Sequence, residues 1–248
     1  MAKARRGWAL AAILILFALL AVWAVMARGR GETAPRQPLA LFTSLPLYWA
    51  EAPDLAAMLA PAGEVHWARA ALDSSYVLRP LDALDGLTNG ASRKLLMAQP
   101  RPLSPAENVA LDAWVRGGGR VLLFADPALT QDSAFALGDR RRPQDTVLLS
   151  PILTRWGLTL EFVEDQPFGE WMATLGGAAL PVNLPGRLRS ARGGTCRIEA
   201  AGLLANCRIG QGRVTVIADA ALFERQHRAA AIELRRRALL VLADEAFR

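Results

Sequence analysis

The chain has few of the residue types that most often carry catalysis or bind metals. It holds only two cysteines and two histidines in 248 residues, and no Cys-x-x-Cys pair that would indicate a zinc site. The Gly-x-Ser-x-Gly and Gly-x-Cys-x-Gly patterns that present a nucleophile on a sharp turn are also missing. His66 and His227 have no nucleophile beside them in sequence, so we interpret both as structural or surface residues. We therefore expect no catalytic residue, no metal and no cofactor.

Lysine is scarce as well, and this shapes the charge of the chain. Lys3 and Lys94 are the only lysines, so the net charge of +6 rests on arginine. The arginines cluster at 140–142 and 235–237 without interleaved aromatic residues. A nucleic-acid surface needs basic residues on one face together with such aromatics. We expect no nucleic-acid partner and interpret the arginines as a solvated face near anionic headgroups.

One long apolar run stands out against this background. Residues 8–27 are twenty consecutive apolar residues preceded by Lys3, Arg5 and Arg6. Twenty helical residues span roughly 30 Å, the thickness of the hydrocarbon core of a bilayer. The run predicts an uncleaved, single-pass anchor in the inner (cytoplasmic) membrane, so the lipid bilayer is an expected partner. A signal peptide cleaved after residues 25–27 is one alternative, and a buried core helix is the other. The basic N-terminus favours a cytoplasmic start and a periplasmic main domain.

Composition along the chain indicates four segments. Residues 1–7 form a basic flank, residues 8–27 the predicted anchor, and residues 28–38 a linker rich in Arg, Gly and Pro. Residues 39–248 are long enough for one α/β domain.

The two cysteines lie close together in sequence, within the stretch 195–209. This stretch is typical of two short strands around a connection, so Cys196 and Cys207 would face each other across a hairpin. A disulfide there would favour an exported domain, because disulfides persist outside the cytosol. Two buried free thiols are the alternative.

The main domain alternates short apolar strands with helices. Strands are expected at 39–45, 64–68, 77–81, 93–98, 120–125, 158–163 and 213–218, and helices at 54–59, 105–116, 147–156 and 225–247. We expect residues 169–194, which are rich in Gly and Pro, to be irregular. Strands that are apolar on both faces favour a mostly parallel sheet covered by helices, with a late β-hairpin and a C-terminal helix.

One stretch carries a family resemblance. Residues 95–129 combine a strand, a helix that opens with Ser104-Pro105 and ends at three glycines, and a second strand ending in Asp126-Pro127. Residues 150–161 and 210–224 continue the pattern. The chain resembles the gliding-associated auxiliary component of ABC-type transport systems and related membrane-anchored bacterial proteins. The resemblance implies a three-layer, flavodoxin-like domain of the class I glutamine-amidotransferase type, with ABC transporter subunits as possible partners.

Two aspartates are the candidate binding residues of this domain. Asp126 and Asp219 each follow a strongly apolar strand, so both would lie in a crevice at the carboxyl edge of the sheet. There they could bind a polar ligand or a cation. The alternative is that each aspartate caps the chain after its strand. Trp49, Trp67, Trp156 and Trp171 could line a sugar-binding surface, although packing is the simpler interpretation.

These observations favour a membrane-anchored accessory protein that is not an enzyme and binds a membrane or periplasmic protein partner. Two alternatives stay open, a divergent envelope hydrolase and a small-ligand or glycan-binding module. Both would use the crevice of Asp126 and Asp219.

Overall fold

The computed structural model describes residues 35–60, 63–90, 92–191 and 194–248. The chain divides into two compact units, Met1–Arg36 and Gln37–Arg248. All described helices and strands belong to the second unit.

The predicted localisation needs a correction. Across the ranges described, no helix is both long and apolar enough to cross a membrane. The predicted anchor, residues 8–27, lies outside the described residues. A single-pass inner-membrane protein with a periplasmic domain is therefore not supported, and this localisation is not retained.

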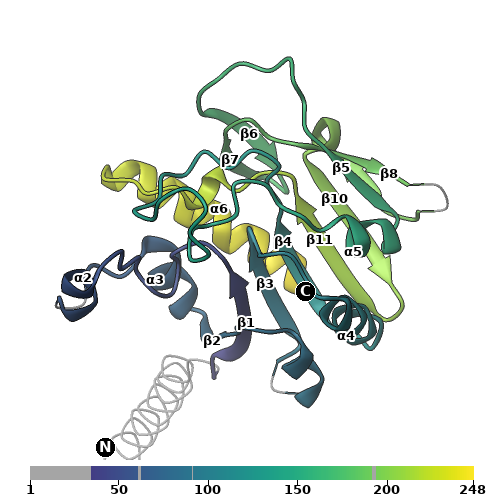
Figure 1. Cartoon of the computed structure of the whole chain (residues 1–248). Coiled ribbons are helices and arrows are strands. Elements are labelled where there is room, and N and C mark those ends of the chain that lie inside the picture. Colours follow the sequence, from purple (N-terminus) through teal and green to yellow (C-terminus); the bar gives the residue numbers. More distant parts are fainter. Residues whose placement is uncertain (1–34, 61–62, 91, 192–193) are drawn as a thin grey trace, which may run out of the picture. The chain divides into compact units, whose positions relative to one another are not determined.

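A seven-stranded sheet forms the centre of the domain (Figure 1). Its spatial order is β2 (Tyr76–Pro80), β1 (Gln37–Thr43), β3 (Lys94–Ala98), β4 (Arg120–Phe124), β11 (Gly212–Ile217), β10 (Leu204–Ile209) and β9 (Arg197–Glu199). The first five strands are parallel to their neighbours, and β10 and β9 are antiparallel. This confirms the predicted α/β class with a mostly parallel sheet and a late hairpin.

Helices cover both faces of the sheet. Against one face pack α3 (Trp67–Asp73) and the C-terminal helix α6 (Ala229–Phe247), and on the other lie α4 (Pro105–Arg116) and α5 (Ser150–Arg155) (Figure 1). The short helix α2 (Leu55–Leu59) has no buried residue. Three 3-10 turns complete the helical elements: η1 (Asp85–Asn89), η2 (Ala200–Gly202) and η3 (Ala221–Phe223).

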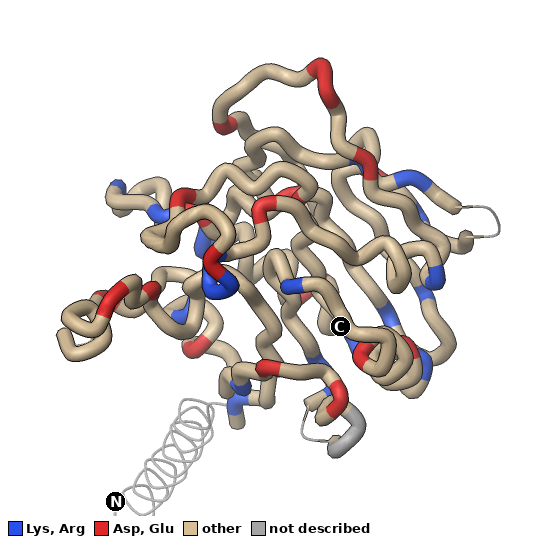
Figure 2. Tube along the Cα trace, in the orientation of Figure 1, with Lys and Arg blue, Asp and Glu red and all other residues tan. Residues whose placement is uncertain are grey.

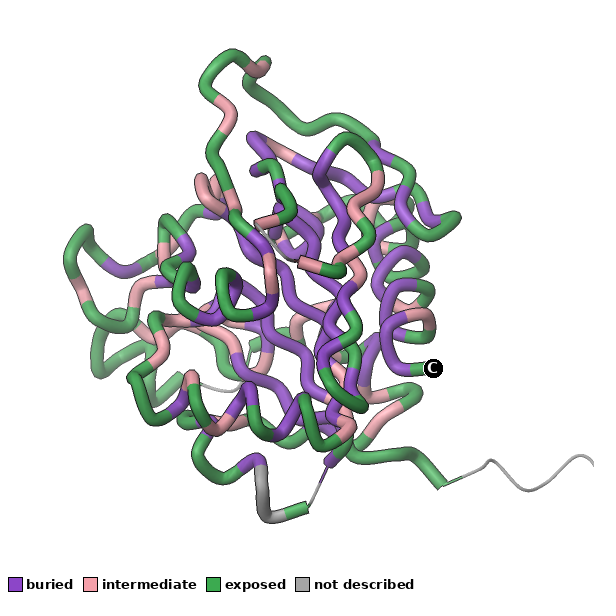
Figure 3. The backbone as a smooth tube through the Cα atoms, turned by 90° about the vertical axis from the view of Figure 1, so that its right-hand side faces the viewer, coloured by how far each residue is buried: buried purple, intermediate pink, exposed green. Residues whose placement is uncertain are grey.

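Burial on both faces explains why the central strands are so apolar. Residues 121–125 and 95–98 are fully buried, and the buried part of the tube follows the sheet (Figure 3). Such two-sided burial is typical of parallel strands that helices cover on both sides. Helix α4 begins as the sequence predicts, with Ser104 and Glu107 forming a reciprocal capping box.

Two local predictions are wrong. Residues 64–68 are not a strand, because Ala68, Ala71 and Leu72 have helical spacing and bury one face of α3, which His66 caps. Residues 169–194 are not irregular. They contain the hairpin of β6 (Trp171–Leu175) and β7 (Ala178–Val182), and β8 (Arg187–Ser190), which pairs with β5 (Leu158–Glu161). The hairpin turns at Gly176-Gly177, where both φ angles are positive, at 54° and 79°.

Candidate functional site

The structure places Asp126 and Asp219 at the same edge of the sheet. Strands β4 and β11 are neighbours with Phe124 opposite Ile217, and each aspartate follows its strand by two residues. Both side chains are covered, with 0% of Asp126 and 1% of Asp219 exposed. The pair therefore lies beneath the surface rather than in an open crevice.

Backbone N–H groups occupy both carboxylates. Asp126 accepts from the N–H of Ala128 (2.8 Å) and of Ala220 (3.1 Å). Asp219 accepts from the N–H of Asn183 (2.9 Å) and of Ala221 (2.7 Å). This is the capping geometry that the sequence left open, and it ties the segments after β4, β7 and β11 together. The ligand-binding role of the pair stays a prediction.

Burial also makes both carboxyls hard to ionise. Loss of solvent raises the pKa of Asp126 to about 7, and the charge of Glu224 adds to the rise. Burial likewise raises the pKa of Asp219 well above its usual range, with the nearby charge of Asp126 as the second cause. The pKa of Glu224 rises for the same reason, although a hydrogen bond from Thr130 opposes the rise. Asn183 donates to the same Thr130 hydroxyl (3.1 Å) and so joins this buried acidic cluster to the end of β7.

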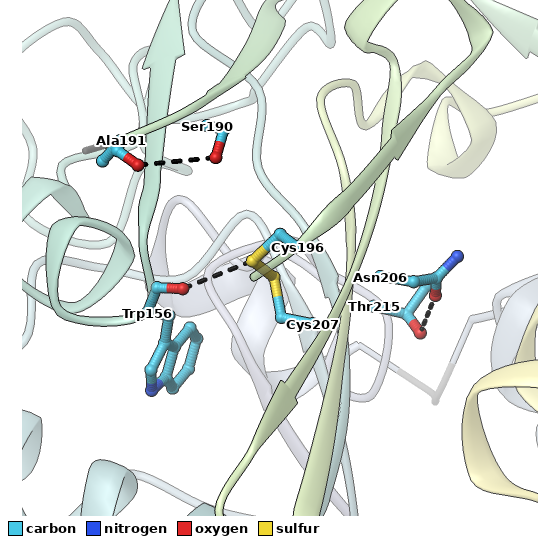
Figure 4. The surroundings of a disulfide bond; sticks show 7 residues. All are labelled: Trp156, Ser190, Ala191, Cys196, Asn206, Cys207 and Thr215. Atoms are coloured by element: carbon cyan, nitrogen blue, oxygen red, sulfur yellow. Dashed lines mark hydrogen bonds between the residues drawn. A yellow bond between two sulfur atoms is a disulfide. The ribbon is translucent and has the colours of Figure 1, made fainter. Parts of the chain in front are cut away.

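The cysteines form the predicted disulfide. Cys196 and Cys207 face each other across β9 and β10, with a Cα–Cα distance of 4.2 Å (Figure 4). Sγ of Cys196 also lies 3.3 Å from the carbonyl oxygen of Trp156 (Figure 4). Neither cysteine is a free thiol, so neither can serve as a nucleophile in this state.

The two histidines lie just before helices α3 and α6. His66 accepts the N–H of Ala68 and caps α3, and burial lowers its pKa to about 4. His227 lies just before α6. Among the described residues, no group of three His, Cys, Asp or Glu side chains could hold a metal ion.

A hollow at the other half of the sheet edge was missed by the sequence analysis. It has a volume of about 540 Å³ and lies over the carboxyl ends of β1, β2 and β3. The strand order reverses there, because β1 is followed in sequence by β2 on one side and then by β3 on the other. In open parallel sheets this reversal leaves a crevice in which ligands bind. Its size suits a small organic ligand.

The wall of the hollow combines aromatic rings with charged groups. Its aromatic members are Phe42, Tyr48, Trp49 and Phe135, and its charged members are Glu51, Asp82, Arg101, Arg140, Arg141 and Arg142. Trp49 is 71% exposed, which is unusual for a residue with so large an apolar side chain. The neighbouring ring of Tyr48 meets it edge-on, with centroids 4.8 Å apart. Arg69 holds Tyr48 in place by donating to its carbonyl oxygen (2.9 Å) and lying over its ring.

Gln99 links Ser44 and Gln144, two residues that line this hollow. Its side chain is fully buried and donates to the carbonyl oxygens of Asp126 (2.9 Å) and Gln144 (2.7 Å). Its own carbonyl accepts the Ser44 hydroxyl at 2.5 Å, and that hydroxyl accepts the N–H of Gln144 at 3.2 Å. Gln99 has a φ of 42°, a conformation that non-glycine residues adopt at a cost and that clusters at functional sites. Gln99, a residue with a strained backbone, thus joins the loop after β1 to the segment that carries Arg140, Arg141 and Arg142.

Glu107 positions the arginine that follows β3. Arg101 donates two hydrogen bonds to its carboxylate, at 3.0 and 2.7 Å. Together with the backbone N–H groups of Ser104 and Leu84, these bonds hold the pKa of Glu107 down at about 2. The N-terminus of α4 is therefore coupled to the wall of the hollow.

The tryptophans divide into two groups. Trp67 and Trp156 belong to the core, where the Trp156 indole donates to Asp112. Trp49 lines the hollow, and Trp171 is 44% exposed on β6, outside it. A second depression of about 500 Å³ is lined by Pro127, Phe162 and Phe168, among others.

Comparison with known proteins finds similarity to solved structures but no match in sequence. No family model matches the chain, and none of the curated proteins matches it. An exo-β-1,4-mannosidase from Opitutaceae bacterium strain TAV5 is similar with a TM-score of 0.46 and 12% identity, over 91% of this chain and 37% of that one. A β-galactosidase from Rahnella sp. R3 has a TM-score of 0.45 and 11% identity, over 91% of this chain and 33% of that one. The β-galactosidase from Bacillus circulans sp. alkalophilus has a TM-score of 0.43 and 10% identity, over 85% of this chain and 31% of that one.

The prediction that the chain is not an enzyme is corrected on this finding. The similar structures are glycosidases, so the absence of activity is not retained. The chain spans about a third of the length of these proteins.

Proposed function

We propose that the chain binds a carbohydrate in the hollow over β1, β2 and β3. The observation that carries the proposal is the exposed Trp49 ring beside hydrogen-bonding side chains, in a hollow of about 540 Å³. A sugar ring has an apolar face that fits an aromatic ring and hydroxyls that need polar partners, and concave sites with these two features bind small molecules. The site differs from the crevice first expected at Asp126 and Asp219, whose oxygens already have backbone donors.

The finer fold class belongs to the same proposal. Five parallel strands in the order β2-β1-β3-β4-β11 follow the flavodoxin-like arrangement, with its ligand crevice between the first and third strands. Helices on both faces agree with a three-layer domain. The transporter-associated partner that the family resemblance implies stays a prediction.

Binding is tested by titrating the full-length chain with cellotetraose and tetragalacturonate in a calorimeter. Trp49→Ala is expected to weaken binding by about tenfold or more, since buried aromatic contacts dominate recognition. Trp171→Ala is the matched control, because that exposed tryptophan lies outside the hollow. Equal binding by Trp49→Ala and the parent contradicts the proposal, as does a failure of both oligosaccharides and of glucose 6-phosphate to bind.

Hydrolysis of the bound glycan is a second candidate function, favoured by one observation. Two carboxylates, Glu51 and Asp82, line the same hollow, and glycoside cleavage uses a pair of carboxyl groups. Glu51 is already oriented by the Ser133 hydroxyl and the Ala134 N–H, both at 2.7 Å. Release of nitrophenol from aryl glycosides that is lost in Glu51→Gln or Asp82→Asn would support this function. Binding without turnover leaves recognition as the function of the hollow.

A further inference from the structure

The wall of the hollow carries more cations than anions. Four arginines line it, Arg101, Arg140, Arg141 and Arg142, against two acidic residues, Glu51 and Asp82. Both carboxylate oxygens of Glu51 accept hydrogen bonds from the segment at Ser133 and Ala134. An incoming ligand therefore meets mainly hydrogen-bond donors.

Three of the four arginines are held by carboxylates that do not line the hollow. Arg101 is paired with Glu107, Arg141 with Asp139 at 2.7 Å, and Arg142 with Asp145 at 3.3 Å. Arg141 also lies over the ring of Phe135, 4.4 Å from its centroid. These contacts fix the guanidinium groups in position and balance much of their charge.

Arg140 differs from these three neighbours. It is exposed on the wall, and within the described part of the chain it has no hydrogen bond and no ion pair. Figure 2 shows Lys and Arg in blue and Asp and Glu in red spread over the described chain, with the two signs close together at several places. A free guanidinium presents five N–H donors in a planar fork that matches a carboxylate or a phosphate.

We propose that the ligand of the hollow is an acidic saccharide, with its sugar ring on Trp49 and its carboxylate or phosphate group on Arg140. The inference rests on the proposed carbohydrate-binding function and narrows it to one class of ligand. The wall supplies one partner for each part of such a ligand, Trp49 for the apolar ring face and Arg140 for the anion.

Three probes separate the two claims in calorimetric titrations of the full-length chain: cellotetraose, tetragalacturonate and glucose 6-phosphate. The acidic probes are expected to bind at least about tenfold more tightly than cellotetraose, and their binding is expected to weaken as salt rises, because exposed charges are screened. Tighter binding of tetragalacturonate identifies the acid as a carboxylate, and tighter binding of glucose 6-phosphate identifies it as a phosphate. Binding by none of the three contradicts the carbohydrate function itself, whereas preference for cellotetraose contradicts this inference alone.

The variant Arg140→Gln tests whether Arg140 binds the acidic group of the saccharide. It is expected to remove most of the preference for the acidic probe over cellotetraose, and Arg140→Lys is expected to restore part of that preference. Arg208→Gln is the control, an exposed arginine on β10 away from the hollow. Acid preference that survives Arg140→Gln overturns the inference, as does competition by inorganic phosphate alone that equals competition by glucose 6-phosphate.

Discussion

Single buried residues set the pH dependence expected of this domain, and Asp219 contributes to it alongside Asp126. Burial raises the pKa of Asp126 from 3.8 to about 7, so the folded state holds a proton that the unfolded state releases between those pH values. Stability is therefore expected to fall as pH rises from about 4 to 7, and each unit of pKa difference corresponds to roughly 1.4 kcal/mol. Asp126→Asn is expected to flatten this fall, measured as denaturant midpoints across pH. Asp165→Asn is the surface control. If the denaturant midpoint of Asp126→Asn depends on pH as steeply as that of the parent, the carboxyl of Asp126 is ionised in the folded state despite its burial.

The packing of β11 against the end of α4 requires glycine at position 212. A Cβ built at this position would lie 2.0 Å from the carbonyl oxygen of Val115 and 2.4 Å from that of Gly119. Both contacts are with backbone, so β11 or the end of α4 would have to move. Gly212→Ala is expected to cost roughly 2–4 kcal/mol of unfolding free energy, measured by urea denaturation. Gly86→Ala, which meets nothing within 4 Å, is the control, and equal stabilities of the two variants would refute the packing assignment.

At the scale of elements, the disulfide stabilises the antiparallel edge of the sheet. It joins residues 11 apart in sequence, across β9 and β10. Closing so short a loop is expected to contribute roughly 2–3 kcal/mol. Reduction should lower the free energy of unfolding by that amount in the parent and leave a Cys196→Ala/Cys207→Ala variant unaffected. Alkylation of both thiols checks that reduction is complete. If the free energy of unfolding is then unchanged, strand pairing alone stabilises this edge of the sheet.

Local chemistry explains which elements the sequence predicted well. The capping box at Ser104 and the apolar runs of β3, β4 and β11 are short-range signals, and all of these elements form. The β6–β7 hairpin carried a signal that was missed, since Gly176-Gly177 is a favoured two-residue turn. Residues 64–68 were misassigned because five residues cannot separate alternation from helical spacing.

The site itself depends on the whole molecule, and this limited its prediction. Apolar strands ending in Asp126 and Asp219 correctly placed the two aspartates at one edge, but the segments that cover them lie far away in sequence. The hollow likewise joins the loop after β1 to residues 135–144 through Gln99 and Ser44, about a hundred residues apart in the last contact. No local sequence pattern predicts that these distant segments come together. Trp49 and Arg140 can therefore be identified as binding residues only from the folded structure.

The most direct test of the carbohydrate site is ¹⁹F NMR of the full-length chain labelled with fluorotryptophan. The chain has seven tryptophans, and Trp49→Phe and Trp171→Phe variants assign two of their resonances. On titration with the tightest-binding saccharide, the Trp49 resonance is expected to shift and saturate with the calorimetric affinity, while that of Trp171 stays in place. A saturable shift of another tryptophan with Trp49 unmoved would contradict the assignment of the hollow as the binding site.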